Sequence, residues 1–188
     1  MSAQLGAYCN RSDVIVLGLP RGGVPVAKTV AEELGVCLGW LAVQKIRLPG
    51  FRPPIGALAD GGVEVWCMDR LRGLLPGHAV VLKAMAKARD ELEGLKHSYG
   101  GDHSHADLTG RCVIIVDDGI ETGTTMRAAI KTVLARGAAS VIVAVPAAPT
   151  EVVNTLRGEC DEVICLTMPQ PFHDLGQYYL DHAYPGSC

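Results

Sequence analysis

The sequence VIIVDDGIETGTT, residues 113–125, carries a hydrophobic run directly into two adjacent carboxylates. Its first four residues are β-branched and apolar, which is typical of a strand buried on both faces. Asp117 and Asp118 follow where this strand should end, and a loop of Gly and Thr comes next. From Met126 onward, apolar residues recur at helical spacing. We therefore expect a strand, a polar loop and a helix N-terminus in succession.

The same order of strand and helix repeats along the chain. Short apolar runs predict strands over 14–19, 38–44, 112–116, 141–145 and 163–166. Helical patterns fall at about 25–34, 77–99, 126–136 and 150–157, and the runs 55–59 and 63–67 flank a hairpin turn, Asp60-Gly61-Gly62. Residues 45–54 read as a loop. The alternation predicts an α/β fold, with a five-stranded, mostly parallel sheet and helices on both faces.

Length and composition limit the classes of function. The 188 residues suit one domain, 1–188, and 48% hydrophobic with 20% charged residues is typical of a globular protein. A net charge of -3 offers no basic field for nucleic acid, and no apolar run approaches the roughly 20 residues of a membrane span. The first ten residues lack a signal-peptide pattern, and the seven scattered cysteines form no CxxC pair. We expect a cytoplasmic protein with reduced thiols.

The loop at 117–125 has the chemistry of a ribose-phosphate site. Backbone N–H groups and the positive end of a helix dipole bind a phosphate dianion, and glycines let the backbone approach it. The hydroxyls of Thr122, Thr124 and Thr125 add hydrogen bonds. Carboxylates repel phosphate, so Asp117 and Asp118 suit sugar hydroxyls or a Mg2+ shell instead. Alone, a pair of acids after a strand is more often a solvated turn.

A second polar turn, Pro20-Arg21-Gly22-Gly23, follows the strand at 14–19. Ligands of parallel α/β sheets bind beyond the carboxyl ends of the strands, which brings this turn and the acid pair into one region. Glycines free the backbone there, and Arg21 can meet a diphosphate in a bidentate way.

These stretches together resemble the type I phosphoribosyltransferase family. The sequence VIIVDDGIETGTT resembles its loop for phosphoribosyl pyrophosphate (PRPP), LGLPRGGVPVA (17–27) resembles its pyrophosphate loop, and VQKIRLPGFRPPIGALADGG (43–62) resembles its flexible catalytic loop. With AVPAAP (144–149) and MPQPFHDLGQYY (168–179), the resemblance extends over 14–181, to a little-characterised branch of predicted bacterial and archaeal phosphoribosyltransferases. Against that branch both ends look short, before residue 14 and after residue 184.

The resemblance implies a pentosyltransferase that moves 5-phosphoribosyl from PRPP to an unidentified acceptor, a nucleobase or related heterocycle, with release of pyrophosphate. Mg2+ would be bound mainly through PRPP, and no residue is directly assigned as its ligand. Catalytic roles are implied for Asp117, Asp118, Lys45 and Arg47, with Arg52 as a further candidate. The ribose and 5'-phosphate would contact Asp117, Asp118, Gly119, Ile120, Glu121, Thr122, Gly123, Thr124 and Thr125. Pyrophosphate would contact Pro20, Arg21, Gly22 and Gly23.

The resemblance also implies a homodimer and a small hood over the acceptor, formed by the tail, 167–188, with Phe172 to Tyr179 as its cover. Two residues depart from the family pattern, because Gly119 replaces an aliphatic residue and Glu121 adds a negative charge beside the expected phosphate. Two alternatives therefore stay open. One is a non-catalytic module that binds PRPP or a nucleotide and serves regulation. The other is a hydrolase in which water replaces the acceptor.

Overall fold

The main sheet has five parallel strands in the order β2-β1-β6-β7-β8. In this computed structural model, residues 1–99 and 106–172 are described. The strands of the main sheet are β1 (Val14–Gly18), β2 (Cys37–Trp40), β6 (Cys112–Val116), β7 (Ser140–Ala147) and β8 (Glu162–Thr167). The predicted five-stranded parallel sheet is confirmed.

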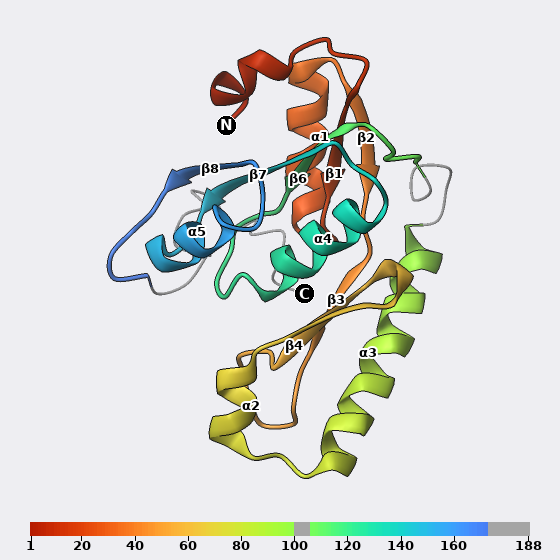
Figure 1. The fold of residues 1–188 in the computed structure, drawn as a ribbon, viewed down its shortest axis with the longest axis vertical. Helices are drawn as coiled ribbons and strands as arrows, with labels where there is room; N and C mark the ends of the chain where they lie inside the picture. Colours follow the sequence, from red (N-terminus) through yellow and green to blue (C-terminus); the bar gives the residue numbers. More distant parts are fainter. Residues whose placement is uncertain (100–105, 173–188) are drawn as a thin grey trace.

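Helices cover both faces of this sheet, as the apolar strands require (Figure 1). They are α1 (Gly23–Leu34), α4 (Thr124–Ala135), α5 (Thr150–Leu156) and a short 3-10 helix, η1 (Ser2–Tyr8). Alternate residues of β1 divide between two cores: Val14 and Val16 pack with α1, whereas Ile15 and Leu17 pack with α4. Helices on both faces are therefore confirmed, and the fold is α/β.

The middle of the chain forms a second, antiparallel sheet in the order β3-β4-β5. Its elements are β3 (Val43–Ile46), β4 (Gly56–Ala59), the 3-10 turn η2 (Asp60–Gly62), β5 (Val63–Trp66), α2 (Met68–Leu74) and α3 (His78–Ser98). The hairpin and the long helix are confirmed. Within the described ranges, no helix combines the length and the apolar character that a membrane crossing requires.

Two sequence predictions were wrong in this region. The single strand expected over 38–44 is two strands, because the chain leaves the main sheet at Leu41, whose N–H donates to the Gly18 carbonyl at 3.1 Å. It then pairs with the small sheet, where the Asp60 N–H donates to the Ala42 carbonyl at 3.0 Å. Lys45, placed in the loop over 45–54, accordingly lies in β3. Helix α2 was not predicted.

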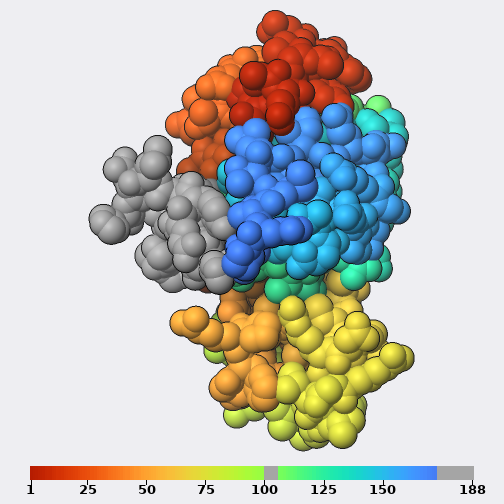
Figure 2. Space-filling model, turned by 90° about the vertical axis from the view of Figure 1, so that its left-hand side faces the viewer, coloured from red at the N-terminus to blue at the C-terminus, as the bar shows by residue number. Residues whose placement is uncertain are grey.

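The small sheet lies between α4 and α3 and projects from the main body as a lobe (Figures 1 and 2). Val43 and Ala57 pack with α4 in one core, while Ile46 and Leu58 pack with α3 in the other. The predicted hood at 167–188 falls largely outside the described residues, which end at 172. The lobe built by α3 supplies a wall that the sequence did not predict.

Candidate active site

A cavity of about 900 Å³ lies where the loops of the main sheet meet the small sheet and α3. Strands β1 and β6 are parallel neighbours in register, with Gly18 opposite Val116, so the loops that follow them emerge side by side. Of the residues predicted for the site, those that line the cavity are Pro20, Arg21, Gly22, Lys45, Arg47, Arg52, Asp117, Asp118, Gly119, Glu121, Thr122, Thr125 and Phe172. The fold thus gathers most of the predicted set around one space.

The two glycines after β1 let its loop touch the acid pair. A Cβ on Gly22 would overlap the carboxylate of Asp118. A Cβ on Gly23 would lie 2.8 Å from both the Asp117 Cα and the Val116 carbonyl oxygen, closer than side chains approach backbone. The Pro20–Arg21 peptide bond is cis. The absence of a side chain at 22 and 23 is therefore what permits the two loops to pack together.

The acid pair is held close and largely out of water. The Asp118 N–H donates to Asp117 Oδ1 at 2.9 Å, and Asp118 is 7% exposed. Burial, together with the nearby Asp118 charge, raises the pKa of the Asp117 carboxyl well above its ordinary value, while the hydrogen bond from the Asp118 N–H and the Lys45 charge act in the opposite direction. Two like charges in a buried site favour a ligand that donates hydrogen bonds or carries positive charge.

Gly123 turns the second loop into α4. It has a left-handed φ of 73° at the N-cap position, where a side chain would be strained and would approach Val152 to 2.8 Å. The side chains of Thr122 and Thr125 line the cavity beside the first turn of this 12-residue helix. Free N–H groups at such a tip suit an anion.

Two residues of this loop lie inside the fold instead of lining the cavity. Thr124 is 2% exposed, and its Oγ1 lies 3.0 Å from Cys67 Sγ and 3.2 Å from Thr122 Oγ1. The Ile120 side chain is buried, and its N–H donates to the Ala147 carbonyl at 2.9 Å. Their contacts with the protein interior hold the loop in place on the side away from the cavity. The thiol of Cys67, at the start of α2, gave no sequence signal for this contact because it is 57 residues away.

Positive charge enters the cavity from several elements. Arg21 comes from the β1 loop and Lys45 from β3, while Arg47 and Arg52 come from the β3–β4 connection. The Arg47 guanidinium donates to the Arg52 carbonyl at 3.4 Å, which ties the two ends of that connection. The cations therefore stand around the twin carboxylates and can meet a polyanion.

Helix α3 forms a wall of the cavity that the sequence prediction missed. The lining residues contributed by this wall are Ala84, Lys87, Ala88, Glu91 and Leu95, and the adjoining β3 contributes Val43, Gln44 and Lys45. The small apolar members had been interpreted only as the buried stripe of a helix. Because α3 begins more than thirty residues after β3 in sequence, no local pattern announces that the two elements share a cavity.

The donor set suits a Mg2+ ion that is shared with a substrate. Among residues 1–99 and 106–172, no group of three or more His, Cys, Asp and Glu side chains is arranged to hold a metal alone. Mg2+ prefers oxygen ligands, keeps several waters and is commonly bound by one or two carboxylates together with substrate phosphates. Asp117 and Asp118 can supply those carboxylates at the edge of the cavity.

Comparison with known proteins gives the family. Residues 69–176 match the family described as "Phosphoribosyl transferase domain". The chain belongs to this family. A Mycobacterium tuberculosis protein named "Putative phosphoribosyl transferase" is 41% identical to it over 179 residues, which is 94% of this chain and 40% of that protein. The chain thus spans about 40% of the length of the curated relatives it matches first.

Solved structures share the fold of this chain. The protein TT1426 from Thermus thermophilus is 38% identical, with a TM-score of 0.73 over 96% of this chain and 87% of that chain. A hypoxanthine phosphoribosyltransferase from Staphylococcus aureus has a TM-score of 0.51 at 12% identity, covering 91% of this chain and 70% of that one. The second likeness shows a shared fold alone.

We predict that Gly23→Ala lowers the free energy of unfolding by about 1–3 kcal/mol, because the added methyl group meets backbone that cannot move aside. Gly73→Ala in α2 is the matched control, since a Cβ there meets nothing within 4 Å. Urea unfolding followed by circular dichroism measures both variants. An unchanged midpoint for Gly23→Ala would contradict the close approach of the loops.

A second prediction concerns Asp117→Asn. The unfolded carboxyl ionises near pH 3.9, whereas the folded one has a raised pKa. The folded state therefore binds more protons between these two values, and wild-type stability falls as pH rises through that window and then levels off. The neutral amide has no such loss. We expect the stability of Asp117→Asn relative to wild type to increase as the pH rises above about 4, and to level off once the pH passes the raised pKa of the folded Asp117 carboxyl.

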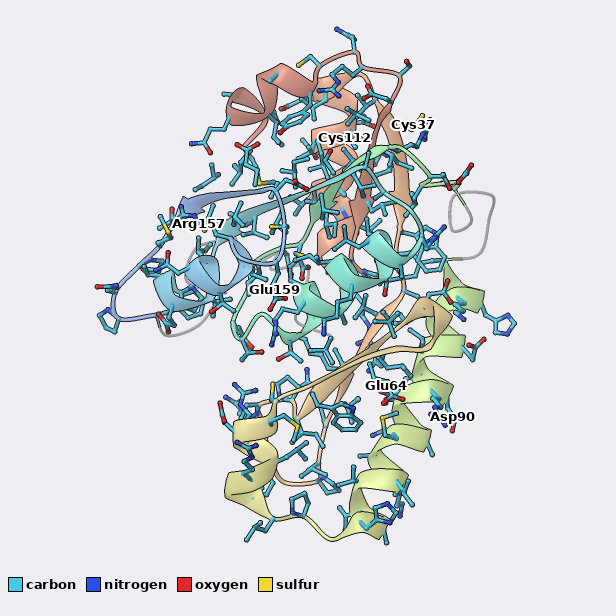
Figure 3. All side chains as sticks on the ribbon, in the orientation of Figure 1. Cys37, Glu64, Asp90, Cys112, Arg157 and Glu159 are labelled. Carbon is cyan, nitrogen blue, oxygen red and sulfur yellow. The ribbon has the colours of Figure 1, made fainter. Side chains whose placement is uncertain are left out.

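Asp90→Asn is the control for this series, because Asp90 is exposed on the outer side of α3 (Figure 3). Its stability relative to wild type should change little with pH. Urea midpoints collected across the pH range give the comparison. A difference between Asp117→Asn and wild type that stays constant with pH would contradict the burial of the ionised pair.

Proposed function

We propose that this chain is a Mg2+-dependent phosphoribosyltransferase that transfers the 5-phosphoribosyl group of PRPP to a nitrogen-containing acceptor and releases pyrophosphate. One observation carries the proposal: the acid pair, the N-terminus of α4 and the turn at Arg21 and Gly22 border the same cavity. Family membership supports the reaction class. A cytoplasmic location and a homodimer remain predictions from the sequence.

The 5'-phosphate would lie at the tip of α4. Backbone N–H groups between Gly119 and Thr125 would bind it there, and the hydroxyls of Thr122 and Thr125 border the cavity at this end. The helix dipole favours the dianion. Thr124, held by Cys67, would act only by keeping the loop in place.

The ribose would lie over the acid pair. Its hydroxyls donate hydrogen bonds, and Asp117 and Asp118 accept them, so the sugar relieves the repulsion between the two carboxylates. The same two side chains would hold Mg2+ together with the oxygens of PRPP. When bound, this ion supplies positive charge that stabilises the departing pyrophosphate.

The leaving pyrophosphate would lie between Arg21, Lys45 and Arg47. The C1–O bond breaks and its electron pair leaves with the pyrophosphate oxygen. The lone pair of the acceptor nitrogen forms the new bond to C1, and the proton lost from that nitrogen passes to solvent. These cations favour the developing negative charge, and the Gly22 and Gly23 backbone lets the anion approach. Positioning and electrostatic stabilisation are the protein's contribution.

A specific observation favours a second candidate function. Glu121 is exposed and borders the cavity within the phosphate loop, where its negative charge opposes binding of the dianion. A module that only binds PRPP or a nucleotide does not need the phosphate to be held in the exact position that catalysis requires, so it would tolerate Glu121. Such a module would bind its ligand and release no pyrophosphate.

The test measures pyrophosphate release with PRPP, Mg2+ and a panel of bases and amines. We predict release by the wild type with a suitable base and at least a ~100-fold loss in Asp118→Asn, because the substitution removes a carboxyl group proposed to accept hydrogen bonds from the ribose hydroxyls. Asp90→Asn should retain the wild-type rate.

Wild-type activity in Asp118→Asn would remove the acid pair from the mechanism. Tight binding of PRPP by calorimetry, with no pyrophosphate from any member of the panel, would establish the binding module instead. Release without any acceptor would establish a hydrolase.

A further inference from the structure

The cavity extends beyond the groups assigned to PRPP. Ligand sites for small organic molecules commonly measure about 300–1,000 Å³, and this one measures about 900 Å³. The end formed by the acid pair and the α4 tip has a partner wall in α3 that the proposed function leaves without a role. The chemistry of that wall indicates what it binds.

A hydrogen-bonded pair of side chains links the wall to β3. Gln44 Nε2 donates to Glu91 Oε2 at 2.6 Å. A carboxylate only accepts hydrogen bonds, so this contact fixes the orientation of the Gln44 amide. Oxygen Oε1 of Gln44 is then left to accept from elsewhere. Glu91 Oε1 lies 3.7 Å from the Lys87 ammonium, an ion-pair distance that is too long for a hydrogen bond, so this oxygen can also accept from a ligand. The pair presents two acceptor oxygens and one remaining donor, the second N–H of the Gln44 amide.

The surface beside this pair is small and apolar. Ala84, Ala88, Glu91 and Leu95 follow each other at spacings of four, three and four residues, which places them on one face of α3. All four line the cavity, and the two alanines are 7% and 2% exposed. Both alanines pack in the core with Ile46 and Leu58, so only the edge of this small apolar surface is open to a flat ring.

Strand β3 places this surface next to the PRPP end. Successive side chains of a strand point to opposite faces, so Gln44 reaches α3 while Lys45 acts on the pKa of Asp117 from the other side. Both residues line the same cavity. Because β3 is an edge strand of the small sheet, the cavity continues around it, and a ligand against α3 reaches toward the ribose group across this edge.

Building on the proposed function, we propose that the α3 wall is the acceptor subsite and that the acceptor is a flat, amino-substituted nitrogen heterocycle. Its amino N–H groups donate to Glu91 and Gln44, and its ring lies against Ala84 and Ala88. A heterocycle with an oxo group at that edge sets its oxygen against the Glu91 carboxylate, and it gains a hydrogen bond only if Lys87 or the second Gln44 N–H turns toward it, so the site favours the amino group. Glu91 and Gln44 are thus specificity-determining residues.

The test compares matched pairs of bases, adenine with hypoxanthine and cytosine with uracil, which differ by an amino or an oxo group at one position. Pyrophosphate release gives kcat/KM for each base with PRPP and Mg2+. The wild type should prefer the amino member of at least one pair by about 10-fold or more. Glu91→Gln supplies an amide donor, so the amino-over-oxo ratio should fall about 10-fold or more.

Glu93→Gln is the matched control, since Glu93 is exposed on the same helix and pairs with Lys96 outside the cavity. It should leave the base ratio unchanged. Calorimetry with PRPP and Mg2+ should give the same affinity for the wild type and Glu91→Gln, because the substitution lies away from the PRPP groups.

The outcomes separate the two proposals. Absence of PRPP binding by folded wild-type protein overturns the proposed function and this inference with it. The acceptor inference alone is overturned if the protein binds or turns over PRPP but prefers the oxo bases. It is likewise overturned if the amino-over-oxo ratio of kcat/KM is unchanged in Glu91→Gln. If turnover is too slow to measure, calorimetry gives the affinity of each of the four bases for the PRPP-loaded protein. Failure of both amino bases to bind then also overturns the acceptor inference.

Discussion

The close approach of two loops, one after β1 and one after β6, is the constraint on which the site depends. These strands are parallel neighbours in register, so their carboxyl ends bring the loops together. Contact between the loops then requires that residues 22 and 23 carry no side chain, because a Cβ would enter the space of Asp117 and Asp118. The glycine pair and the acid pair are one structural unit.

That unit creates an electrostatic imbalance that a ligand can relieve. Burial and the neighbouring Asp118 charge raise the pKa of Asp117, and the hydrogen bond from the Asp118 N–H and the Lys45 charge offset this rise only in part. Sugar hydroxyls and a divalent cation are the partners that two crowded carboxylates favour. In the proposed function, the phosphoryl groups would lie at the α4 tip and near Arg21, away from the like-charged carboxylates of Asp117 and Asp118.

Much of the fold was predictable, because strands that are buried on both faces form continuous apolar runs that are easily recognised in the sequence. The strands at 112–116 and 141–145 and the hairpin around Asp60 are examples. The break at Leu41 was not predictable, because both sheets bury their residues there and the apolar run continues without a turn signal. Helix α2 is short and contains Gly73, which weakens any helical pattern.

The site likewise has a part that was predictable from the sequence and a part that was not. Twin acids and glycines lie within contiguous stretches, so their chemistry was visible locally. Gln44 and Glu91 are 47 residues apart, and only the packing of α3 on the small sheet brings them together. Thr124 was expected to face the phosphate, whereas its side chain, in the first turn of α4, points to Cys67. Contacts between distant segments are what the sequence pattern alone does not contain.

A crystal structure of the protein soaked with ribose 5-phosphate tests the central claim most directly. We predict the phosphate at the N-terminus of α4, within hydrogen-bond distance of the N–H groups near Thr122 and Thr125, and the ribose hydroxyls on Asp117 and Asp118. A phosphate bound at the Arg21 loop with the acid pair uncontacted, or a cavity that stays empty at saturating ligand, would contradict it.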